Sequence, residues 1–255
     1  MLKMEYLCSK IEEEMARILV LAPSGFGKTT SWAGRKKLGI KGLNPKETYA
    51  IQCIGRGVPN PEYKLCPSAD IKDIAKGNRV NVEFLTGLDR FKRVAELIDN
   101  LKKSPYRNIV IDDFNYLMQD YYMANAMKGG WQTPKEIGYG MGLIFDAFKG
   151  FPENKHIYVC AHYEKVNDND GQVTYQMKTT GKMVNEYCTP QGKFDIMLYG
   201  KQTFDESKHQ AIKVFVKDFD GTFPAKDSLG VLDDLPDEFP NDLSIVDEKL
   251  REVYG

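Results

Sequence analysis

The sequence predicts an α/β fold, in which a mostly parallel sheet is flanked by helices and followed by a C-terminal β-hairpin and a short helix. Residues 18–21 and 109–111 are apolar at every position, which is typical of parallel strands with both faces covered. Segments with helical periodicity separate such runs, as in βαβ units. A glycine-rich turn at residues 22–29 joins the first run to the first helical segment.

The expected elements alternate along the chain. Strands are expected over residues 17–21, 49–54, 79–86, 108–114, 156–161, 194–199 and 211–219. Helices are expected over residues 28–38, 89–104, 114–127, 133–148 and 244–253. This pattern predicts one core domain over residues 1–232 and an acidic tail over residues 233–255, which contains eight acidic and two basic residues.

Local signals define several of these elements. Asp89 is the expected N-cap of the second helix, and residues 133–136 (TPKE) form a capping box with proline at the first helical position. Residues 163–193 are polar with little periodicity, so we expect a long loop there. The Asp220-Gly221 pair is a hairpin turn signal.

Residues 22–29 (APSGFGKT) match the looser form of the P-loop, or Walker A motif, with Ala22 in place of the usual first glycine. Small residues let backbone N–H groups surround an anion, Lys28 can reach the β- and γ-phosphates, and the Thr29 hydroxyl can bind Mg²⁺. The simpler alternative is a turn that only joins a strand to a helix. The predicted nucleotide-binding residues are Pro23, Ser24, Gly25, Phe26, Gly27, Lys28, Thr29 and Thr30.

Two carboxylates end the strand expected at residues 108–114. On a strand beside the P-loop strand, Asp112 would reach the Mg²⁺ shell, although an Asp at a strand end also commonly forms an Asx turn. Asp113 occupies the place of a carboxylate that orients the attacking water, with Glu83 and Glu164 as rival bases.

His162 follows the apolar strand expected at residues 156–161, where ligands gather in open α/β sheets. It could contact the γ-phosphate and report hydrolysis to the next loop, or it could be a structural histidine. The predicted catalytic residues are Lys28, Asp113 and His162, and the predicted metal ligands are Thr29 and Asp112.

Composition limits the classes of protein. The 255-residue chain is 42% hydrophobic and 28% charged, as in ordinary globular proteins. No apolar run approaches the length of a membrane span, and no signal-peptide core is visible, so we expect a cytoplasmic protein with no membrane partner. The five cysteines contain no C-x-x-C pair, which argues against a disulfide framework and a zinc site.

The combination of APSGFGKTT, GLNPKET, NIVIDDF, AHYEKV, MKTTGKM and FPNDLSIVDEKLREVYG resembles phage-encoded single-strand annealing ATPases with a RecA-like core. The resemblance implies ATP and Mg²⁺ as cofactors, DNA-dependent ATP hydrolysis, single-stranded DNA binding and strand annealing in phage recombination. It also implies a ring or filament of identical subunits, a single-strand binding protein as partner, and the host cell cytoplasm as location.

Two loops of such cores face the DNA, and here they correspond to residues 127–135 and 163–183. The implied DNA-binding residues are Lys128, Trp131, Lys135, Lys165, Tyr175, Lys178 and Lys182. Lys217 and Lys226 are the candidates for basic residues that act on the nucleotide of a neighbouring subunit.

The chain departs from this family pattern in two ways. It has no room for the separate terminal domains of full-length RecA, and residues 49–54 contain no glutamate to serve as the base. Hydrolysis is therefore expected to be slow or to use Asp113. The alternatives are a nucleotide-gated helicase loader, a packaging accessory ATPase, or a small-molecule P-loop kinase with residues 163–193 as its lid.

Overall fold

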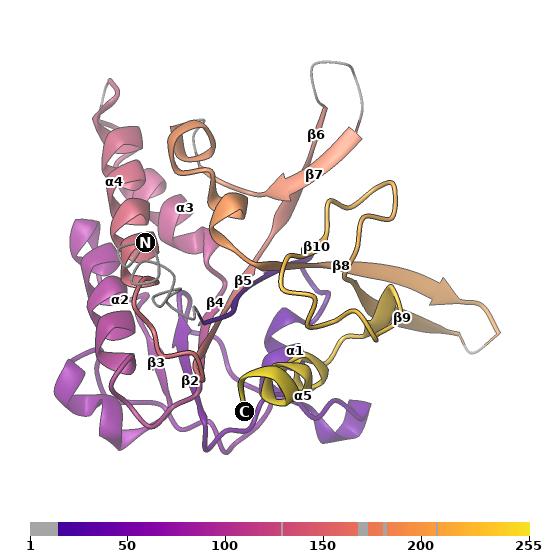
Figure 1. Ribbon diagram of the computed structural model, residues 1–255. Coiled ribbons are helices and arrows are strands. Elements are labelled where there is room, and N and C mark those ends of the chain that lie inside the picture. The colour runs from indigo at the N-terminus through magenta and orange to yellow at the C-terminus, as the bar shows by residue number, and fades with distance from the viewer. Residues whose placement is uncertain (1–14, 129, 168–172, 181–182, 208) are drawn as a thin grey trace, which may run out of the picture.

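The computed structural model describes residues 15–255 except 129, 168–172, 181–182 and 208. Within these residues one nine-stranded sheet runs in the order β11-β9-β8-β1-β5-β4-β2-β3, with β10 paired to β8 (Figure 1). Its strands are β1 (Arg17–Leu21), β2 (Thr48–Gln52), β3 (Arg79–Asn81), β4 (Asn108–Asp112), β5 (His156–Ala161), β8 (Ile196–Asp205), β9 (Gln210–Val216), β10 (Lys226–Asp227) and β11 (Glu238–Pro240).

The six strands from β8 to β3 are parallel, and β9, β10 and β11 add antiparallel pairs at the β8 end. Helices α2 (Gly87–Leu101), α3 (Asn115–Ala124) and α4 (Gln132–Ala147) cover one face. Helices α1 (Lys28–Ala33) and α5 (Leu243–Tyr254) cover the other face (Figure 1). The predicted α/β class with a mostly parallel sheet is therefore confirmed.

The central strands are apolar throughout because each contributes to two cores. In β1, Leu19 and Leu21 pack in the core under α2, α3 and α4, whereas Ile18 and Val20 pack in the core under α1 and α5. Both faces of the strand exclude water, so alternation with polar residues is absent. This confirms the interpretation of the apolar runs.

Helix α1 is shorter than predicted, since it ends at Ala33 rather than near residue 38. Gly34 follows with a positive φ of 80°, and a Cβ there would lie 2.2 Å from the carbonyl oxygen of Lys41. Residues 36–38 form a separate 3₁₀ turn. A close approach of two backbone segments therefore stops the helix.

Two predicted helix starts were wrong. Helix α2 begins at Gly87, so Asp89 lies in its first turn rather than at the N-cap. Helix α4 begins at Gln132, and the buried Thr133 hydroxyl has no hydrogen-bond partner, so the capping box does not form. Glu136 instead accepts hydrogen bonds from Tyr121 Oη at 2.6 Å and from Gln132.

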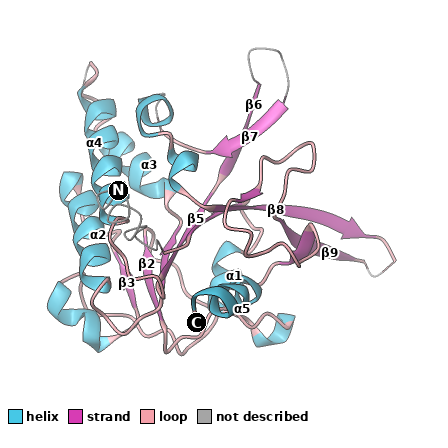
Figure 2. Cartoon of the chain, viewed as in Figure 1, coloured by secondary structure: helices cyan, strands magenta, loops and turns pink. Residues whose placement is uncertain are grey.

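The long loop predicted over residues 163–193 was also wrong. Strands β6 (Tyr163–Asn167) and β7 (Val173–Met177) form an antiparallel hairpin that projects from the body (Figure 2). Short helical turns follow at residues 184–188 and 190–193. The base of the hairpin is fixed by aromatic contacts, because Tyr163 packs on Phe223 with ring centroids 5.6 Å apart.

The Asp220-Gly221 signal does not mark a strand-to-strand turn. Strands β8 and β9 pair from Tyr199 with Val216 to Asp205 with Gln210, so the C-terminal hairpin turns earlier in the sequence. Asp220 Oδ1 instead accepts hydrogen bonds from the backbone N–H groups of residues 222 and 223, at 2.9 and 2.8 Å. The signal therefore belongs to an Asx turn.

Strand β3 ends at Asn81 rather than at residue 86, and β4 ends at Asp112 rather than at residue 114. In the described part of the chain, no helix combines the length and apolar character that a membrane crossing requires.

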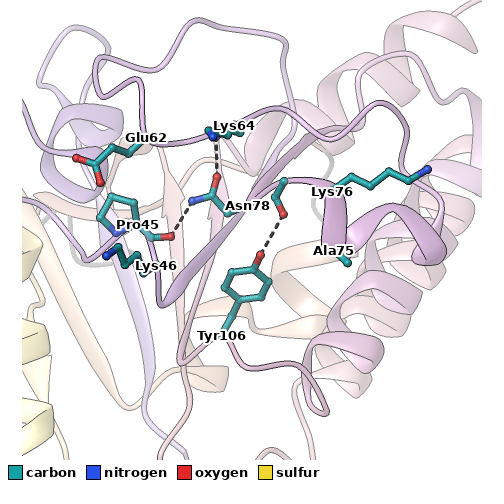
Figure 3. Close-up of a pocket in the computed structure, with 9 residues that line it drawn as sticks. Pro45, Lys46, Glu62, Lys64, Ala75, Lys76, Asn78 and Tyr106 are labelled. Atoms are coloured by element: carbon teal, nitrogen blue, oxygen red, sulfur yellow. Dashed lines mark hydrogen bonds between the residues drawn. The ribbon is translucent and has the colours of Figure 1, made fainter.

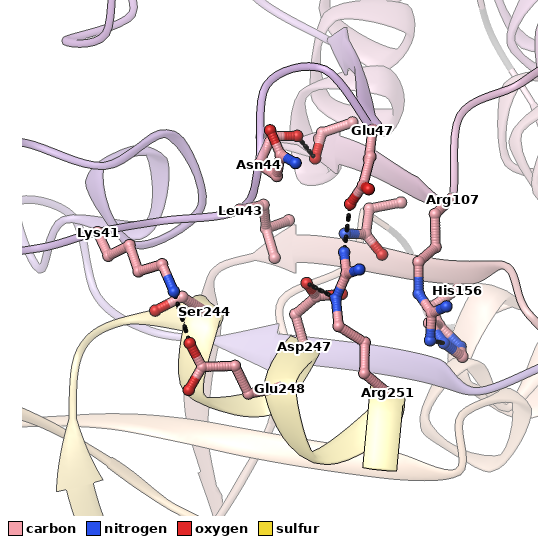
Figure 4. Close-up of polar contacts among 12 residues, drawn as sticks. Lys41, Leu43, Asn44, Glu47, Arg107, His156, Ser244, Asp247, Glu248 and Arg251 are labelled. Carbon is pink, nitrogen blue, oxygen red and sulfur yellow. Dashed lines mark hydrogen bonds and ion pairs between the residues drawn. The ribbon is translucent and has the colours of Figure 1, made fainter. Parts of the chain in front are cut away.

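Helix α5 of the acidic segment packs into the domain (Figure 4). Its Asp247 accepts a hydrogen bond from Asn108 Nδ2 at 2.9 Å and pairs with Arg251 Nε at 2.9 Å. Arg251 also pairs with Glu47, in the segment that leads to β2. Polar side chains of this helix therefore bind an amide of β4 and a carboxylate before β2. A domain boundary at residue 232 stays a prediction.

Candidate nucleotide-binding site

The candidate site lies at the carboxyl ends of four neighbouring parallel strands. In the sheet, β1, β5, β4 and β2 lie side by side, and their carboxyl ends lead into the P-loop, His162, Asp113 and Arg56. These segments enclose a cavity of about 150 Å³. The residues that line it are Ser24, Gly25, Gly27, Lys28, Thr29, Arg56, Asp113 and His162.

The P-loop backbone has the geometry of an anion cradle. Gly25 and Gly27 have φ values of 76° and 104°, which side-chain-bearing residues rarely adopt. Helix α1 starts at Lys28, and Asn241 Nδ2 donates to the carbonyl of Phe26 at 3.3 Å. The first-turn N–H groups of α1 therefore adjoin the cavity.

Ala22 fits because of a neighbouring strand. A Cβ on Gly200 of β8 would lie 2.5 Å from the Ala22 methyl group, so the small residue at each position makes room for the other. Ala22 is fully buried and its N–H donates to the Ala161 carbonyl at 3.2 Å. Ala22, at the irregular first position of the motif, is thus accommodated by its packing against Gly200.

Lys28 is buried at the centre of the site. Its Nζ donates to the carbonyls of Ala22 at 3.0 Å and Pro23 at 3.3 Å, and lies 3.1 Å from His162 Nδ1. Burial lowers the pKa of Lys28, and the Arg56 charge acts in the same direction. Two backbone carbonyls hold the amine where a phosphate oxygen could replace them.

Thr29 and Asp112 form a pair of hard oxygen ligands. Thr29 Oγ1 donates to Asp112 Oδ2 at 2.7 Å, while the buried Asp112 Oδ1 has no hydrogen-bond partner. Burial, followed by repulsion from Asp113, raises the pKa of Asp112 above its usual range. A hydroxyl beside a carboxylate with a free oxygen fits Mg²⁺, whose charge would favour the ionised form.

The expectation that the Asp112 strand lies beside the P-loop strand was wrong. Strand β4 pairs with β5 and β2, and β5 lies between β4 and β1. Asp112 still reaches Thr29 because α1 begins over the carboxyl ends of these strands.

Asp113 has a left-handed backbone, with φ of 59°, and is only 4% exposed. Its Oδ1 lies 3.9 Å from His162 Nε2, and its Oδ2 lies 3.7 Å from Arg56 Nη1. The carboxylate therefore points into the cavity between two nitrogen-bearing side chains.

His162 contacts the P-loop and the base of the hairpin. Its Nδ1 lies 3.2 Å from the Ala22 carbonyl, and burial and then the Lys28 charge lower its pKa. Its backbone N–H donates to Asn115 Oδ1, and Asn115 Nδ2 donates to the carbonyl of Lys178 just after β7. One buried amide thus holds both ends of the β6–β7 hairpin.

Sequence reasoning missed Arg56, Tyr116 and Asn115. The Arg56 guanidinium lies 6.0 Å from the ring centroid of Tyr116, and that ring meets His162 edge-on at 6.2 Å. The available signal was Gly55-Arg56-Gly57, an arginine between glycines directly after a buried strand.

Glu83 and Glu164, the alternative candidates for the base, make contacts outside the cavity. Glu83 accepts a hydrogen bond from the Gly55 N–H at 2.6 Å, and Glu164 accepts one from Gln176 across the hairpin at 3.3 Å. Neither glutamate lines the cavity.

Of the predicted DNA-binding residues that the structure describes, Lys128 and Trp131 lie in the α3–α4 connection, and Lys135 lies in the first turn of α4. Lys165 and Tyr175 lie in the β6–β7 hairpin, and Lys178 follows it directly. Both regions are at one end of the molecule (Figure 1). Trp131 is 73% exposed, and the lysines at positions 128, 135, 165 and 178 are also exposed. Tyr175 is half-buried against Phe223, with centroids 4.8 Å apart, so its ring is already packed. Lys182 lies outside the described residues.

The two lysines expected to act on a neighbouring subunit have contacts within their own chain. Lys217 is 4% exposed and pairs with Asp218, which raises its pKa. Lys226 is half-buried in β10.

A second cleft of about 500 Å³ lies at the amino ends of β2, β3 and β4, opposite the nucleotide site (Figure 3). Its polar groups bond to one another: Asn78 Nδ2 donates to the Pro45 carbonyl at 2.7 Å, and Tyr106 Oη donates to the Gly77 carbonyl at 3.1 Å. Exposed Lys46 and Lys64 lie at its rim.

No family model and no curated protein matches the chain by sequence. A KaiC-like protein from the hyperthermophilic archaeon Pyrococcus horikoshii, known from a crystal structure, is similar with a TM-score of 0.42 and 9% identity. The match covers 80% of this chain and 79% of that one.

Proposed function

We propose that this chain is an ATP-hydrolysing protein with a RecA-like core, which binds single-stranded DNA and promotes strand annealing in phage recombination. The Thr29–Asp112 hydrogen bond is the observation that supports nucleotide binding most directly, because Thr29 lines the same cavity as Lys28. It joins the P-loop to the carboxylate strand as a metal–nucleotide site requires.

Each side chain has a defined part in this proposal. Lys28 exchanges its two carbonyl partners for β- and γ-phosphate oxygens, and the α1 amides hold the same phosphates. Thr29 and Asp112 hold Mg²⁺, which when bound supplies positive charge to the phosphate oxygens. Asp113 orients water and accepts its proton; its short side chain fits the expectation of slow hydrolysis.

The DNA-binding part rests on the sequence resemblance and on the exposed residues of the α3–α4 connection and the hairpin. Lysines neutralise phosphates, and an exposed indole such as that of Trp131 can stack on a base. His162 is the proposed sensor, because it contacts Lys28 and its backbone anchors the hairpin through Asn115.

The remaining partners follow from the same resemblance. They are a single-strand binding protein and further copies of this chain in a ring or filament, acting in the host cytoplasm. Lys217 and Lys226 are proposed to contact the nucleotide of a neighbouring subunit. This requires that assembly break the Lys217–Asp218 ion pair and expose Lys226.

ATP hydrolysis and annealing of complementary labelled oligonucleotides test this function. We expect slow hydrolysis that single-stranded DNA accelerates, and annealing that requires ATP and is lost in Lys28→Ala. Nucleotide binding without DNA stimulation or salt-sensitive DNA binding would instead indicate a nucleotide-gated loader or packaging accessory protein. Phosphoryl transfer to a small molecule would indicate a kinase.

A further inference from the structure

Arg56 is a second basic side chain in the nucleotide cavity. It comes from the loop after β2, the strand next to β4. Among the described residues that line the cavity, Lys28 and Arg56 are the basic side chains besides His162. Lys28 lies on the P-loop side, and Arg56 lies on the Asp113 side.

The backbone of Arg56 is held firmly by neighbouring groups. Gln52 Nε2 donates to its carbonyl at 3.1 Å, and its N–H donates to the Ile54 carbonyl at 2.9 Å. Glu83 accepts a hydrogen bond from the adjacent Gly55 N–H at 2.6 Å. The loop that presents the arginine is therefore ordered by contacts outside the cavity.

The side chain itself is held loosely. It is 56% exposed, its Nη1 is 3.7 Å from Asp113 Oδ2, and its guanidinium carbon lies 6.0 Å from the Tyr116 ring centroid. A distance of 3.7 Å is too long for a good hydrogen bond. An anion in the cavity could therefore attract the guanidinium without breaking a strong contact.

The order of the strand ends indicates which part of the nucleotide Arg56 would meet. The P-loop lines the cavity from the β1 end, where it would hold the phosphate chain, and Asp113 and Arg56 line the side next to β4 and β2. Phosphates that enter along the P-loop meet this wall at their terminal group, where Lys28 also reaches.

We propose that Arg56 binds the γ-phosphate of ATP from within the same chain and stabilises the charge on it during hydrolysis. This inference rests on the proposed function. In the step, the water oxygen bonds to the γ-phosphorus, the bond to the bridging oxygen breaks, and its electron pair leaves on ADP. The water proton passes to Asp113 and then to solvent, while Arg56 stays protonated.

This role gives the site a cation that needs no neighbouring subunit. Lys217 and Lys226, the residues expected to act between subunits, are buried or half-buried in their own chain. An arginine also suits this role because its planar guanidinium can donate two parallel N–H groups to two oxygens of one phosphate.

The test compares the affinities of the full chain for ADP and for a non-hydrolysable ATP analogue. Arg56→Gln should weaken analogue binding about tenfold or more and leave ADP binding within about twofold, because only the γ-phosphate is lost as a partner. Arg56→Lys should retain part of the preference for the ATP analogue over ADP. Arg35→Gln, a change at an exposed arginine outside the cavity, should match the wild type.

Turnover gives a second measurement. Arg56→Gln should lower kcat by about 1,000-fold or more, the lower end of the range for other arginines that act on phosphoryl groups. An unchanged ratio of analogue to ADP affinity in Arg56→Gln, with wild-type and Lys28→Ala behaving as proposed, would overturn the Arg56 role alone. Failure of the wild type to bind either nucleotide would overturn both proposals.

Discussion

Asn115 holds His162 in place: its side-chain oxygen accepts the backbone N–H of His162, and its side-chain nitrogen donates to the carbonyl of Lys178. Asn115 is fully buried and stands two residues after Asp113. The carboxylate strand, the proposed sensor and both ends of the β6–β7 hairpin therefore meet at one amide group.

Asn115→Ala should reduce the free energy of unfolding by about 2–4 kcal/mol, because it removes two hydrogen bonds and leaves two partly buried backbone groups without this partner. Urea denaturation measures this loss, and faster proteolysis within residues 163–177 should accompany it. Asn125→Ala, which removes a single hydrogen bond to Tyr121 at the end of α3, is the control and should cost about 1 kcal/mol. Equal losses for the two variants would contradict the anchoring role.

Lys28→Ala should weaken ATP binding by about 100-fold, or roughly 2.7 kcal/mol, because it removes the buried amine that would meet the phosphates. Isothermal titration measures the affinity. Lys28→Met keeps the length of the side chain without its charge and should lose affinity equally, which separates charge from packing. Lys37→Ala, at an exposed lysine, is the control. Unchanged affinity in both Lys28 variants would refute the P-loop assignment.

Asp112→Asn should abolish most of the Mg²⁺ dependence of ATP binding, since it removes the charge beside Thr29 Oγ1. We expect affinity at saturating Mg²⁺ to fall about tenfold or more, with little change in the presence of a chelator. Thr29→Ser keeps the hydroxyl and should keep the dependence. Asp146→Asn, on the exposed surface of α4, is the matched control. A wild-type Mg²⁺ response in Asp112→Asn would exclude it as a ligand.

A combined change of four lysines to alanine tests the DNA-binding surface. The residues are Lys128, Lys135, Lys165 and Lys178. If each contacts one phosphate, the slope of log affinity against log salt for single-stranded DNA should become shallower by about 3.

The matched control changes four exposed lysines on other parts of the chain to alanine. They are Lys36, Lys37, Lys46 and Lys64, of which the last two lie at the rim of the cleft in Figure 3. Fluorescence anisotropy at several salt concentrations measures both sets. Equal slopes would show that the charge of the chain as a whole, rather than this surface, attracts DNA.

Stability should fall in mild acid because of His156. Burial lowers its pKa from 6.5 to about 3, so the folded state keeps the ring neutral while the unfolded state takes up a proton below pH 6.5. The stabilisation is complete above pH 6.5 and is lost as pH falls from 6.5 towards 3, by about 1.4 kcal/mol per pH unit.

Chemical denaturation between pH 7 and 5 measures this dependence. His156→Asn should show a shallower loss of stability than the wild type, although it is less stable at pH 7. His209→Asn, at an exposed turn, should follow the wild-type curve. Parallel curves for wild type and His156→Asn would rule out His156 as the source.

Buried strands and the motifs at their ends could be predicted, because both depend on the local sequence pattern. Strand β5 was predicted with its observed bounds because both of its faces are buried, so every residue after His156 is apolar, aromatic or small. The P-loop and His162 were found because each directly follows such a strand, and Asp112 was found because it is the last residue of one. The P-loop, His162 and Asp113 line one cavity. Asp112 does not line it, but it accepts a hydrogen bond from Thr29, which does.

What could not be predicted depends on distant neighbours. The β6–β7 hairpin is held by rings from other segments, among them Tyr199 and Phe223, so its own sequence lacks a strand pattern. Arg56 lies between two glycines, which predict only a loop. It reaches the site because β2 lies next to β4 in the sheet. Strand order is a tertiary property, and for the same reason β5 was not expected between β1 and β4.

The position of β1 at the centre of the sheet has a consequence for how the chain folds. Arg17 pairs with Ile157, and Ile18 pairs with Ile196, so both neighbours of the P-loop strand come from much later in the sequence. Such high contact order slows folding. The P-loop is synthesised before β5, so its strand lacks this partner until β5 has been made. On the proposed function, ATP can therefore stabilise the fold as a ligand only after β5 has been synthesised.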